Sequence, residues 1–327
     1  MKKVSILVPI YNVERYIERC AITLFEQTYA NIEYIFVNDC TKDKSIEILQ
    51  TVIDRYPDRK NSIQIINHEL NRGIAAVRNT ALNNATGEFI IWVDSDDYIE
   101  IQTIEKCINI INRTNADIVV YGSRSIYNDK ETKQSYKISN NATDYICDIL
   151  RRETSTSIWG KMYKHSLFLD NKIFAVEGCD SGEDYFLNIC ASYYAKKIIA
   201  IDEIFYNYDR TNDSSITHVF KESIINSLAK YINDISIFLK SKPDYCQYIE
   251  ALDAAKLLAK VTLSISWGLS SSSTIGAIQQ IKDIFPDVSS RISLPWKYQL
   301  VLFLVQKKWY YLLRWYVHLG MKLKNNT

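Results

Sequence analysis

The first hundred residues alternate short, continuously apolar runs with segments of helical periodicity. The apolar runs are VSILVPI, IEYIFVN, SIQIIN and EFIIWV, at residues 4–10, 32–38, 62–67 and 88–93. The segments between them with apolar residues at helical spacing are 13–28, 42–55 and 73–85. Short, uninterrupted, β-branched runs are typical of strands that are buried on both faces. Their alternation with helices predicts βαβ units and a mostly parallel sheet.

The rest of the chain follows this pattern less regularly. We expect Asn12 to cap the first helix, and a further helix to begin near Ile99. The later elements that we expect are a strand at 117–127, a helix at 141–152, a strand or turn at 157–164, a helix at 183–195, a strand pair within 197–210, and helices from about 219 to the end. The sequence therefore predicts an α/β fold with a mixed, mostly parallel sheet flanked by helices, in residues 1–218, and a helical C-terminal region in residues 219–327.

Composition narrows the class of protein. The chain has 327 residues, 47% of them hydrophobic and 24% charged, which is typical of a globular protein. A net charge of +1 argues against a general nucleic-acid binder. Seven scattered cysteines without a C-x-x-C pair favour reduced thiols in a cytoplasm. No run of eighteen apolar residues occurs, so we expect no transmembrane helix.

Polar clusters follow three of the predicted strands. They are PIYN at 9–12, NDC at 38–40 and DSDD at 94–97. In sheets of parallel strands, ligands bind at the carboxyl ends of the strands, beside a topological switch point. The three clusters therefore predict a ligand site at one edge of the sheet.

The acidic cluster after the fourth strand has two interpretations. Asp94 and Asp96 would lie too far apart in an extended chain to hold one cation together, so a turn is needed. Three carboxylates at a buried strand end would raise each other's pKa, and a hard divalent cation would relieve the repulsion. Alternatively, Ser95, Asp96 and Asp97 cap the helix expected near Ile99. Because one residue suffices for a cap, we favour the cation.

The motifs VSILVPIYN, VNDCTKDKS, NRGIAAVRN and GEFIIWVDSDD, in this order and spacing, resemble those of family 2 glycosyltransferases. That family has the GT-A fold and uses nucleotide-activated sugars, and the resemblance extends to about residue 210. It implies that Asp96, the last residue of the D-x-D motif, ligates Mg²⁺ or Mn²⁺ on the donor diphosphate. Asp94 would hold the ribose or the donor sugar, with Ser95 between them.

The resemblance also implies a nucleotide pocket. Asp39 would accept the imide N–H of uracil or thymine, and Pro9, Tyr11 and Asn12 would pack around the base and ribose. An ordinary turn stabilised by Asx-type hydrogen bonds is the alternative at Asp39. The family more often has V-D-D-G-S here, whereas this chain has Asn38, Cys40 and Thr41. Loss of the glycine at position 40 reduces backbone freedom.

The segment NRGIAAVRN opens the third helix. Amide groups of the helix that begins at Gly73 would face phosphate, and the resemblance places Arg78 in the donor pocket. Alternatively, Arg78 and Asn79 anchor this helix to the sheet.

A second acidic pair, Glu183 and Asp184, opens a helix after a glycine-containing loop. Carboxylates are stabilised at a helix N-terminus whether or not they are catalytic. The resemblance identifies them as the family's E-D motif, with Asp184 as the catalytic base and Glu183 fixing an acceptor hydroxyl.

Three further residues are weaker candidates for acceptor or phosphate binding. Trp159 would stack on a sugar or simply belong to the core, and Lys161 would support phosphate or the acceptor. In the segment 206–217, Arg210 with Ser214 and Ser215 would clamp the diphosphate, unless this segment is a solvated loop. We expect His218 to be structural.

The tail, residues 288–327, contains seven Lys or Arg residues, no Asp or Glu, and three of the six tryptophans. Aromatic, basic amphipathic helices bind membrane interfaces. Alternatives are packing on the catalytic domain and a dimer face. We favour contact with the inner surface of the cell membrane by an otherwise cytoplasmic protein.

Together these features predict an inverting, metal-dependent glycosyltransferase. It would move a sugar from a nucleotide-sugar donor, most simply a UDP-sugar, to a hydroxyl of a glycan or lipid-linked acceptor in bacterial surface polysaccharide synthesis. A sugar nucleotidyltransferase is one alternative, although PIYNVERY lacks its glycine-rich phosphate loop. A non-catalytic, membrane-associated scaffold is the other, although both acidic motifs are complete.

Overall fold

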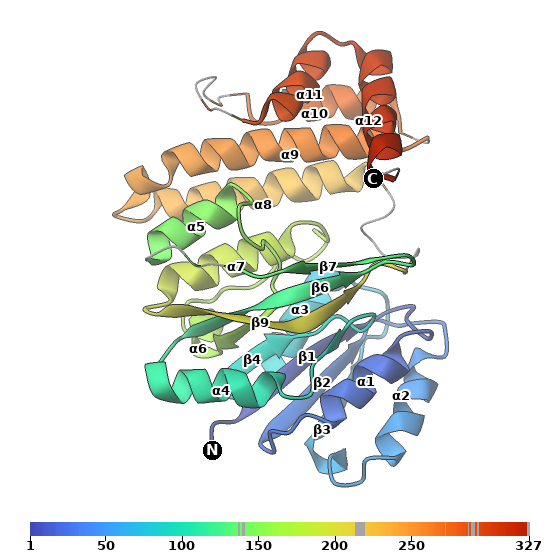
Figure 1. Cartoon of the computed structure of the whole chain (residues 1–327), viewed down its shortest axis with the longest axis vertical. Coiled ribbons are helices and arrows are strands. Elements are labelled where there is room, and N and C mark those ends of the chain that lie inside the picture. Colours follow the sequence, from blue (N-terminus) through green and yellow to red (C-terminus); the bar gives the residue numbers. More distant parts are fainter. Residues whose placement is uncertain are drawn as a thin grey trace. The chain divides into compact units, whose positions relative to one another are not determined.

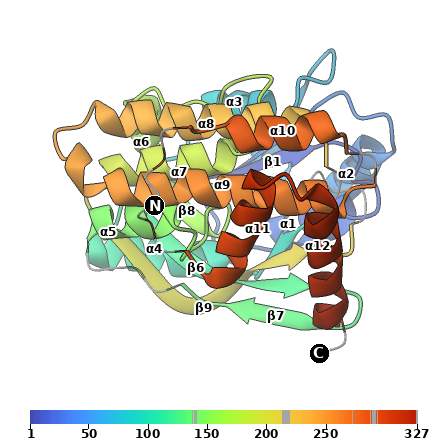
Figure 2. The ribbon, with the colours of Figure 1, turned by 90° about the horizontal axis from the view of Figure 1, so that it is seen from above.

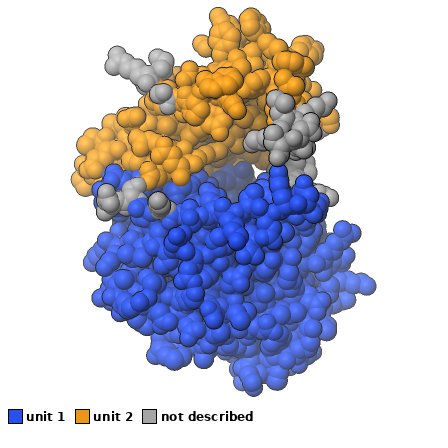
Figure 3. Space-filling view, in the orientation of Figure 1, with its two compact units in different colours: residues 1–146, 154–213 blue, residues 147–153, 214–327 orange. Residues whose placement is uncertain are grey.

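The structure is a computed structural model. It describes residues 1–136, 138, 141–212, 220–271, 273–286, 288, 292 and 294–325, with only the backbone of 321–325. The chain forms two compact units (Figure 3): unit 1 comprises residues 1–146 and 154–213, and unit 2 comprises residues 147–153 and 214–327. The predicted boundary at 218/219 lies within 213–219, outside the described residues.

Unit 1 contains the alternating strands and helices that the sequence predicts. In chain order they are β1 (Val4–Ile10), α1 (Ile17–Phe25), β2 (Ile32–Asn38), α2 (Ser45–Asp54), the 3₁₀ helix η1 (Lys60–Ser62), β3 (Ile63–Asn67), α3 (Ile74–Asn84), β4 (Phe89–Trp92), β5 (Tyr98–Ile99), α4 (Thr103–Thr114), β6 (Ile118–Ile126), β7 (Glu131–Gln134), α5 (Ala142–Leu150), which ends in unit 2, β8 (Lys161–Lys164), α6 (Ser166–Leu169), α7 (Glu183–Tyr194) and β9 (Ile198–Asp209).

The strands form one mixed sheet (Figure 1). Within the described residues its order is β3-β2-β1-β4-β8-β6-β9-β5, with β7 paired to β6. The first four strands are parallel. β8 then runs antiparallel to both β4 and β6, and β6 runs parallel to β9. The predicted α/β fold with a mixed sheet and flanking helices is confirmed.

Helices α1, α2 and α4 cover one face of the sheet, and the residues of β1 show why. Val4, Ile6, Val8 and Ile10 point into a core that contains Leu24 of α1 together with side chains of α2 and α4. Leu7, from the alternate positions of the strand, is equally buried. Because both faces of β1 are covered, its sequence is continuously apolar rather than alternating.

Three local predictions are wrong. Asn12 does not cap α1: it has a φ of 55°, and the helix begins at Ile17 after a turn. No helix begins near Ile99, because Tyr98 and Ile99 form β5, paired with β9. The segment 197–210 contains one long strand, β9 (Ile198–Asp209), rather than a pair. Its charged Asp202–Glu203 step lies at an irregularity of the β6–β9 register, so the strand continues past the break in the apolar pattern.

Unit 2 is helical, as predicted. Its elements are α8 (Ser223–Lys240), the 3₁₀ helix η3 (Tyr245–Gln247), α9 (Ile249–Leu269), α10 (Ile275–Asp283), α11 (Trp296–Gln306) and α12 (Tyr310–Asn325). Within the described part of the chain, we find no helix whose length and apolarity would let it span a bilayer.

Candidate active site

The three polar clusters meet at one edge of the sheet, as predicted. β1 lies between β2 and β4, and all three strands are parallel, so their carboxyl ends share an edge. The backbone N–H of Asn12 donates to the Thr41 hydroxyl at 2.9 Å, which joins the ends of β1 and β2. Tyr11 is exposed at this edge, whereas Pro9 is buried inside β1.

The acidic segment after β4 folds into a turn. The backbone N–H of Asp97 donates to the carbonyl of Asp94 at 2.9 Å, with Ser95 and Asp96 at the turn itself. The buried Asp97 carboxylate accepts from the Tyr206 hydroxyl at 2.7 Å and from the backbone N–H of Asp209 at 2.8 Å. The helix that these acids were expected to cap does not begin until Thr103, so capping does not explain them.

Asp96 is held from two other segments. Its carboxylate accepts from the Asn212 side chain at 2.9 Å, and its carbonyl accepts from Arg19 at 3.1 Å. Burial raises the pKa of Asp96, although the Asn212 hydrogen bond opposes this shift.

Arg78 connects the two acidic motifs. This buried guanidinium lies 3.4 Å from an Asp94 oxygen, 3.5 Å from a Glu183 oxygen and 2.9 Å from an Asp184 oxygen. It also packs over Trp92, 5.3 Å from the ring centre, and its Nη1 is buried without a hydrogen-bond partner. Arg78 therefore does more than fix α3 to the sheet. Its neighbour Asn79 exchanges hydrogen bonds with the backbone of Ala175 and so ties α3 to the loop between α6 and α7.

Three carboxylates share the single guanidinium of Arg78, and two of them have raised pKa values. Burial, with added repulsion from Asp184 and Asp96, raises the pKa of Asp94 to about 6 against the attraction of Arg78. Burial and Asp184 raise the pKa of Glu183 to about 7. Although burial alone would lower the pKa of Arg78, the surrounding carboxylates raise it. The site therefore carries negative charge that one guanidinium does not compensate.

This donor set fits a hard divalent cation that a substrate helps to bind. Across the described ranges, no three His, Cys, Asp or Glu side chains lie together as a ready-made metal centre. Mg²⁺ usually needs only one or two protein carboxylates, with substrate phosphates as further ligands. Asp96 and Asp94, on one turn with raised pKa values, meet that requirement.

Asp39 organises the loop that leads into α3. Its two oxygens accept from the backbone N–H groups of Arg72 at 2.9 Å and Gly73 at 2.8 Å, and one oxygen lies 2.8 Å from Nδ1 of His68. These contacts are consistent with a structural role for Asp39, because its buried carboxylate holds the exposed loop between β3 and α3. The role of Asp39 in base recognition remains a prediction.

The N-terminus of α3 is already occupied by a side chain. Gly73 has a φ of 84°, and the Ala75 N–H donates to the Asp180 carboxylate at 3.1 Å. A Cβ at Gly73 would overlap that carboxylate. Beside it, Arg72 forms a bidentate pair with Glu177, at 2.8 and 3.0 Å. A phosphate at the start of this helix would have to replace Asp180.

Cys40, which stands where the family more often has glycine, adopts the left-handed conformation, with a φ of 57°. Cys40→Gly is expected to raise the free energy of unfolding by up to about 1 kcal/mol. Relief of about 1–2 kcal/mol of backbone strain outweighs the greater entropy of glycine in the unfolded chain. Urea unfolding measures this effect.

Cys246→Gly is the matched control. Cys246 lies in η3 and has no positive φ, so glycine there relieves no strain and should lower the free energy of unfolding. A Cys40→Gly protein less stable than the wild type would contradict the strain at this position.

The three weaker candidates have other partners. Trp159 stacks on Tyr206, with ring centres 4.4 Å apart, so one of its faces is covered. Lys161 is buried and donates to the Ser157 carbonyl at 2.6 Å, and burial lowers its pKa to about 7. Arg210 donates to the hydroxyl of Tyr208. Their roles toward a substrate remain predictions.

The residues that position the acids were not predicted from the sequence. Tyr206, Asn212 and Arg19 lie far along the chain from the groups they bind. The alternation of Tyr206 and Tyr208 in β9 was the only sequence pattern that could have indicated such residues. Ser214, Ser215 and His218 lie outside the described residues.

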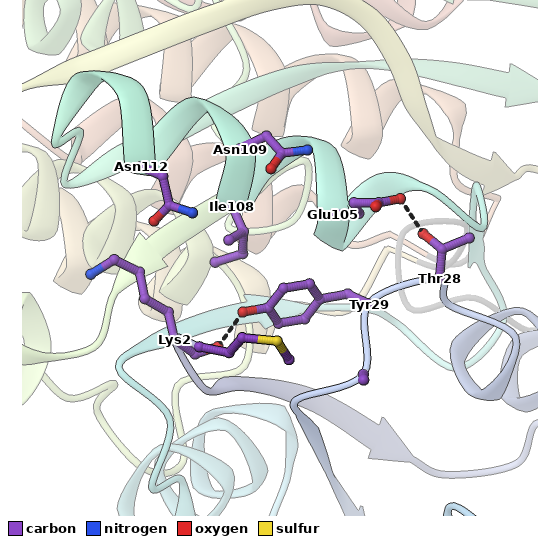
Figure 4. A pocket seen from close by; sticks show the side chains of 9 residues that line it. Lys2, Thr28, Tyr29, Glu105, Ile108, Asn109 and Asn112 are labelled. Atoms are coloured by element: carbon purple, nitrogen blue, oxygen red, sulfur yellow. Dashed lines mark hydrogen bonds between the residues drawn. The ribbon is translucent and has the colours of Figure 1, made fainter.

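A cavity of about 570 Å³ is lined by Lys2, Tyr29, Glu105 and Asn109, among others (Figure 4). It lies beside α4 and the start of β1, and none of the acids of the candidate site lines it. The cavity is therefore near the amino end of β1, whereas the carboxylates lie at the carboxyl ends of the strands.

Comparison with known proteins identifies the class of domain to which this fold and these two acidic motifs belong. Glycosyl transferase family 2 matches residues 5–175. The chain belongs to this family.

Curated relatives are similar over about two thirds of the chain. Glycosyltransferase GlyA of Streptococcus pneumoniae is 32% identical over 245 residues, which cover 71% of this chain and 34% of that protein. Glycosyltransferase EpsJ of Bacillus subtilis is 32% identical over 235 residues, which cover 69% of this chain and 67% of that protein. The poly(ribitol-phosphate) beta-N-acetylglucosaminyltransferase TarS of Staphylococcus aureus is 29% identical over 211 residues, which cover 64% of this chain and 35% of that protein. The match to GlyA thus spans about a third of that relative.

A solved structure agrees with the fold. TarS 1–349 in complex with UDP-GlcNAc superposes with a TM-score of 0.72 at 21% identity, covering 98% of this chain and 92% of that chain. The expected GT-A fold is confirmed.

Proposed function

We propose that this chain is an inverting, metal-dependent glycosyltransferase that moves a sugar from a nucleotide diphosphate sugar to an acceptor hydroxyl. The observation that carries the proposal is the contact of Arg78 with Asp94 and Asp184. It brings the D-x-D turn, predicted to hold the donor, against the acidic pair predicted to activate the acceptor.

Asp184 is better placed than Glu183 to act as the base. Its side chain is 24% exposed, against 9% for Glu183. An acceptor hydroxyl can therefore reach Asp184 more readily than Glu183.

Asp96, with Asp94, would hold a Mn²⁺ or Mg²⁺ ion. When bound, such an ion neutralises charge on the diphosphate leaving group. Asp184 takes the proton of the acceptor hydroxyl, whose oxygen forms a bond to the anomeric carbon. The bond from that carbon to the diphosphate breaks, and its electron pair leaves with the diphosphate. Displacement from the opposite face inverts the anomeric centre.

The relatives guide the choice of substrate class. TarS is named as an N-acetylglucosaminyltransferase, and its structure was solved with UDP-GlcNAc. This supports a UDP-sugar as donor, with a hexosyl or N-acetylhexosaminyl group transferred. We extend the proposal to a glycan or lipid-linked acceptor in bacterial surface polysaccharide synthesis, and to a cytoplasmic protein at the inner surface of the membrane. A homodimer formed through the tail is the alternative use of that segment.

Calorimetric titration with UDP, dTDP, GDP and ADP tests the donor site. One pyrimidine diphosphate, most simply UDP, is expected to bind in the presence of Mn²⁺ and to lose affinity in chelator. Asp96→Ala is expected to weaken the metal-dependent binding by more than about tenfold, because it removes a charged ligand.

Asp170→Ala, at an exposed carboxylate of the same unit, is the matched control and should bind as the wild type does. Asp96 would be excluded as a metal ligand if Asp96→Ala bound the nucleotide as tightly as the wild type, or if nucleotide binding were the same with Mn²⁺ and with chelator.

A further inference from the structure

Helices α11 and α12 of unit 2 each present two apolar faces. One face is buried: Val301, Leu304 and Val305 of α11, and Leu313 and Val317 of α12, are nearly inaccessible to solvent. These side chains account for the packing of both helices, which contact each other and α9 (Figure 2).

The second face is exposed and aromatic. On α12, Tyr311, Trp315 and Leu319 recur every four residues and therefore form one stripe. Tyr311 is 87% exposed and Trp315 61%. Their exposure is not explained by the packing of unit 2, since the buried residues lie on the other side of the helix.

Further exposed aromatic residues lie on α11 and in the turn after it. Trp296 is 66% exposed, and Phe303, seven residues later, is on the same side of the helix. Trp309 is 52% exposed and packs edge-on against Phe303, with ring centres 5.8 Å apart. We call Trp296, Phe303, Trp309, Tyr311, Trp315 and Leu319 the aromatic face.

Lysines lie among these side chains. Lys297 Nζ is 5.9 Å from the ring centre of Trp296, and Lys307 Nζ is 5.9 Å from that of Phe303. Lys308 is also exposed. In sequence, no Asp or Glu occurs from residue 288 to the end. The charged residues of the segment that carries the aromatic face are therefore all basic, and Asp283 of α10 is the acid near Tyr310.

We propose that the aromatic face binds the surface of an anionic phospholipid bilayer. Indole and phenol rings are amphipathic and are stabilised at the level of the headgroups, while lysine stems extend their ammonium groups to lipid phosphates. A second copy of the chain fits less well, since a symmetric contact would bring the same lysines together. This inference does not depend on the identity of the transferred sugar.

Flotation of the full chain with lipid vesicles tests the proposal. Binding is expected to vesicles that contain phosphatidylglycerol and not to pure phosphatidylcholine, and it should weaken as salt rises. Replacing Lys297, Lys307 and Lys308 together with Gln should weaken binding on the order of 100-fold, at about fivefold for each lysine. Trp309→Ser with Trp315→Ser should weaken it by more than about tenfold.

Matched controls lie on α8 of the same unit. Ile237 is 66% exposed, and Lys240 is also exposed, so Ile237→Ser and Lys240→Gln should leave binding unchanged. Equal binding to both vesicle types, or no binding to either, would overturn the proposal. So would light scattering in which the Trp309/Trp315 variant turns a dimer into a monomer, because the face would then be a subunit interface.

Discussion

Asp184→Asn is expected to lower sugar transfer by roughly 10²–10⁴-fold, the usual contribution of a general base. The amide keeps the shape of the side chain but cannot take the proton of the acceptor. Because Asp184 lies 2.9 Å from Arg78 and not in the D-x-D turn, metal-dependent nucleotide binding should persist. Initial rates of transfer and calorimetry on the same protein separate the two effects.

Asp170→Asn provides the control for this substitution, since Asp170 is an exposed carboxylate of the same unit. The assignment of Asp184 fails if Asp184→Asn transfers sugar near the wild-type rate. Retention of the donor's anomeric configuration in the product would instead exclude inversion and leave the donor site untouched.

Arg78→Met is expected to destabilise unit 1 by about 3–5 kcal/mol near pH 8, since it leaves buried carboxylates without their cation. Arg78→Lys should recover part of this loss, because lysine restores the charge but not the planar fork that reaches several carboxylates. Thermal unfolding across a pH series measures both effects.

The pH dependence has a definite sign. Asp94 and Glu183 have pKa values of about 6 and 7, above their ordinary values. Between about pH 4 and 7, the folded protein therefore holds protons that the unfolded chain has lost, so these groups lower stability as pH rises. Without Arg78 this fall should be steeper, and the deficit of Arg78→Met should shrink as pH drops from 8 to 5.5.

Arg15→Met, at an exposed arginine, is the control and should show no such pH-dependent deficit. A deficit in Arg78→Met that stays constant over the pH range would mean that Arg78 contributes by packing, for instance on Trp92, rather than by charge.

The sequence predicted the parallel part of the sheet well, because buried strands such as β1 have a distinctive apolar pattern. It also brought Asp39, Asp94 and Asp96 to one edge, since parallel strands place their ends together. Both successes rest on local patterns and a general rule of topology.

What escaped prediction depends on side chains that meet across long separations. Nothing local distinguishes Arg78 as the partner of Asp184, or Asp180 as the partner of Ala75 at the start of α3. The failures at Asn12 and Ile99 have the same origin. Contact with Thr41 holds Asn12 outside the helix, and pairing with Tyr206 makes Ile99 part of a strand.

The contacts of the acidic turn with the last strand of unit 1 bear on when the site can form during synthesis. Asp97 and Tyr206 are 109 residues apart, and Asp96 and Asn212 are 116 apart. The segment that matches the family ends at residue 175, before any of these partners and before Asp184. A nascent chain of that length already contains the D-x-D turn with Arg19 and Arg78, but neither Tyr206 nor Asn212. Contacts of such range are slow to form, so Asp96 and Asp97 lack these two partners until the ribosome has passed residue 212.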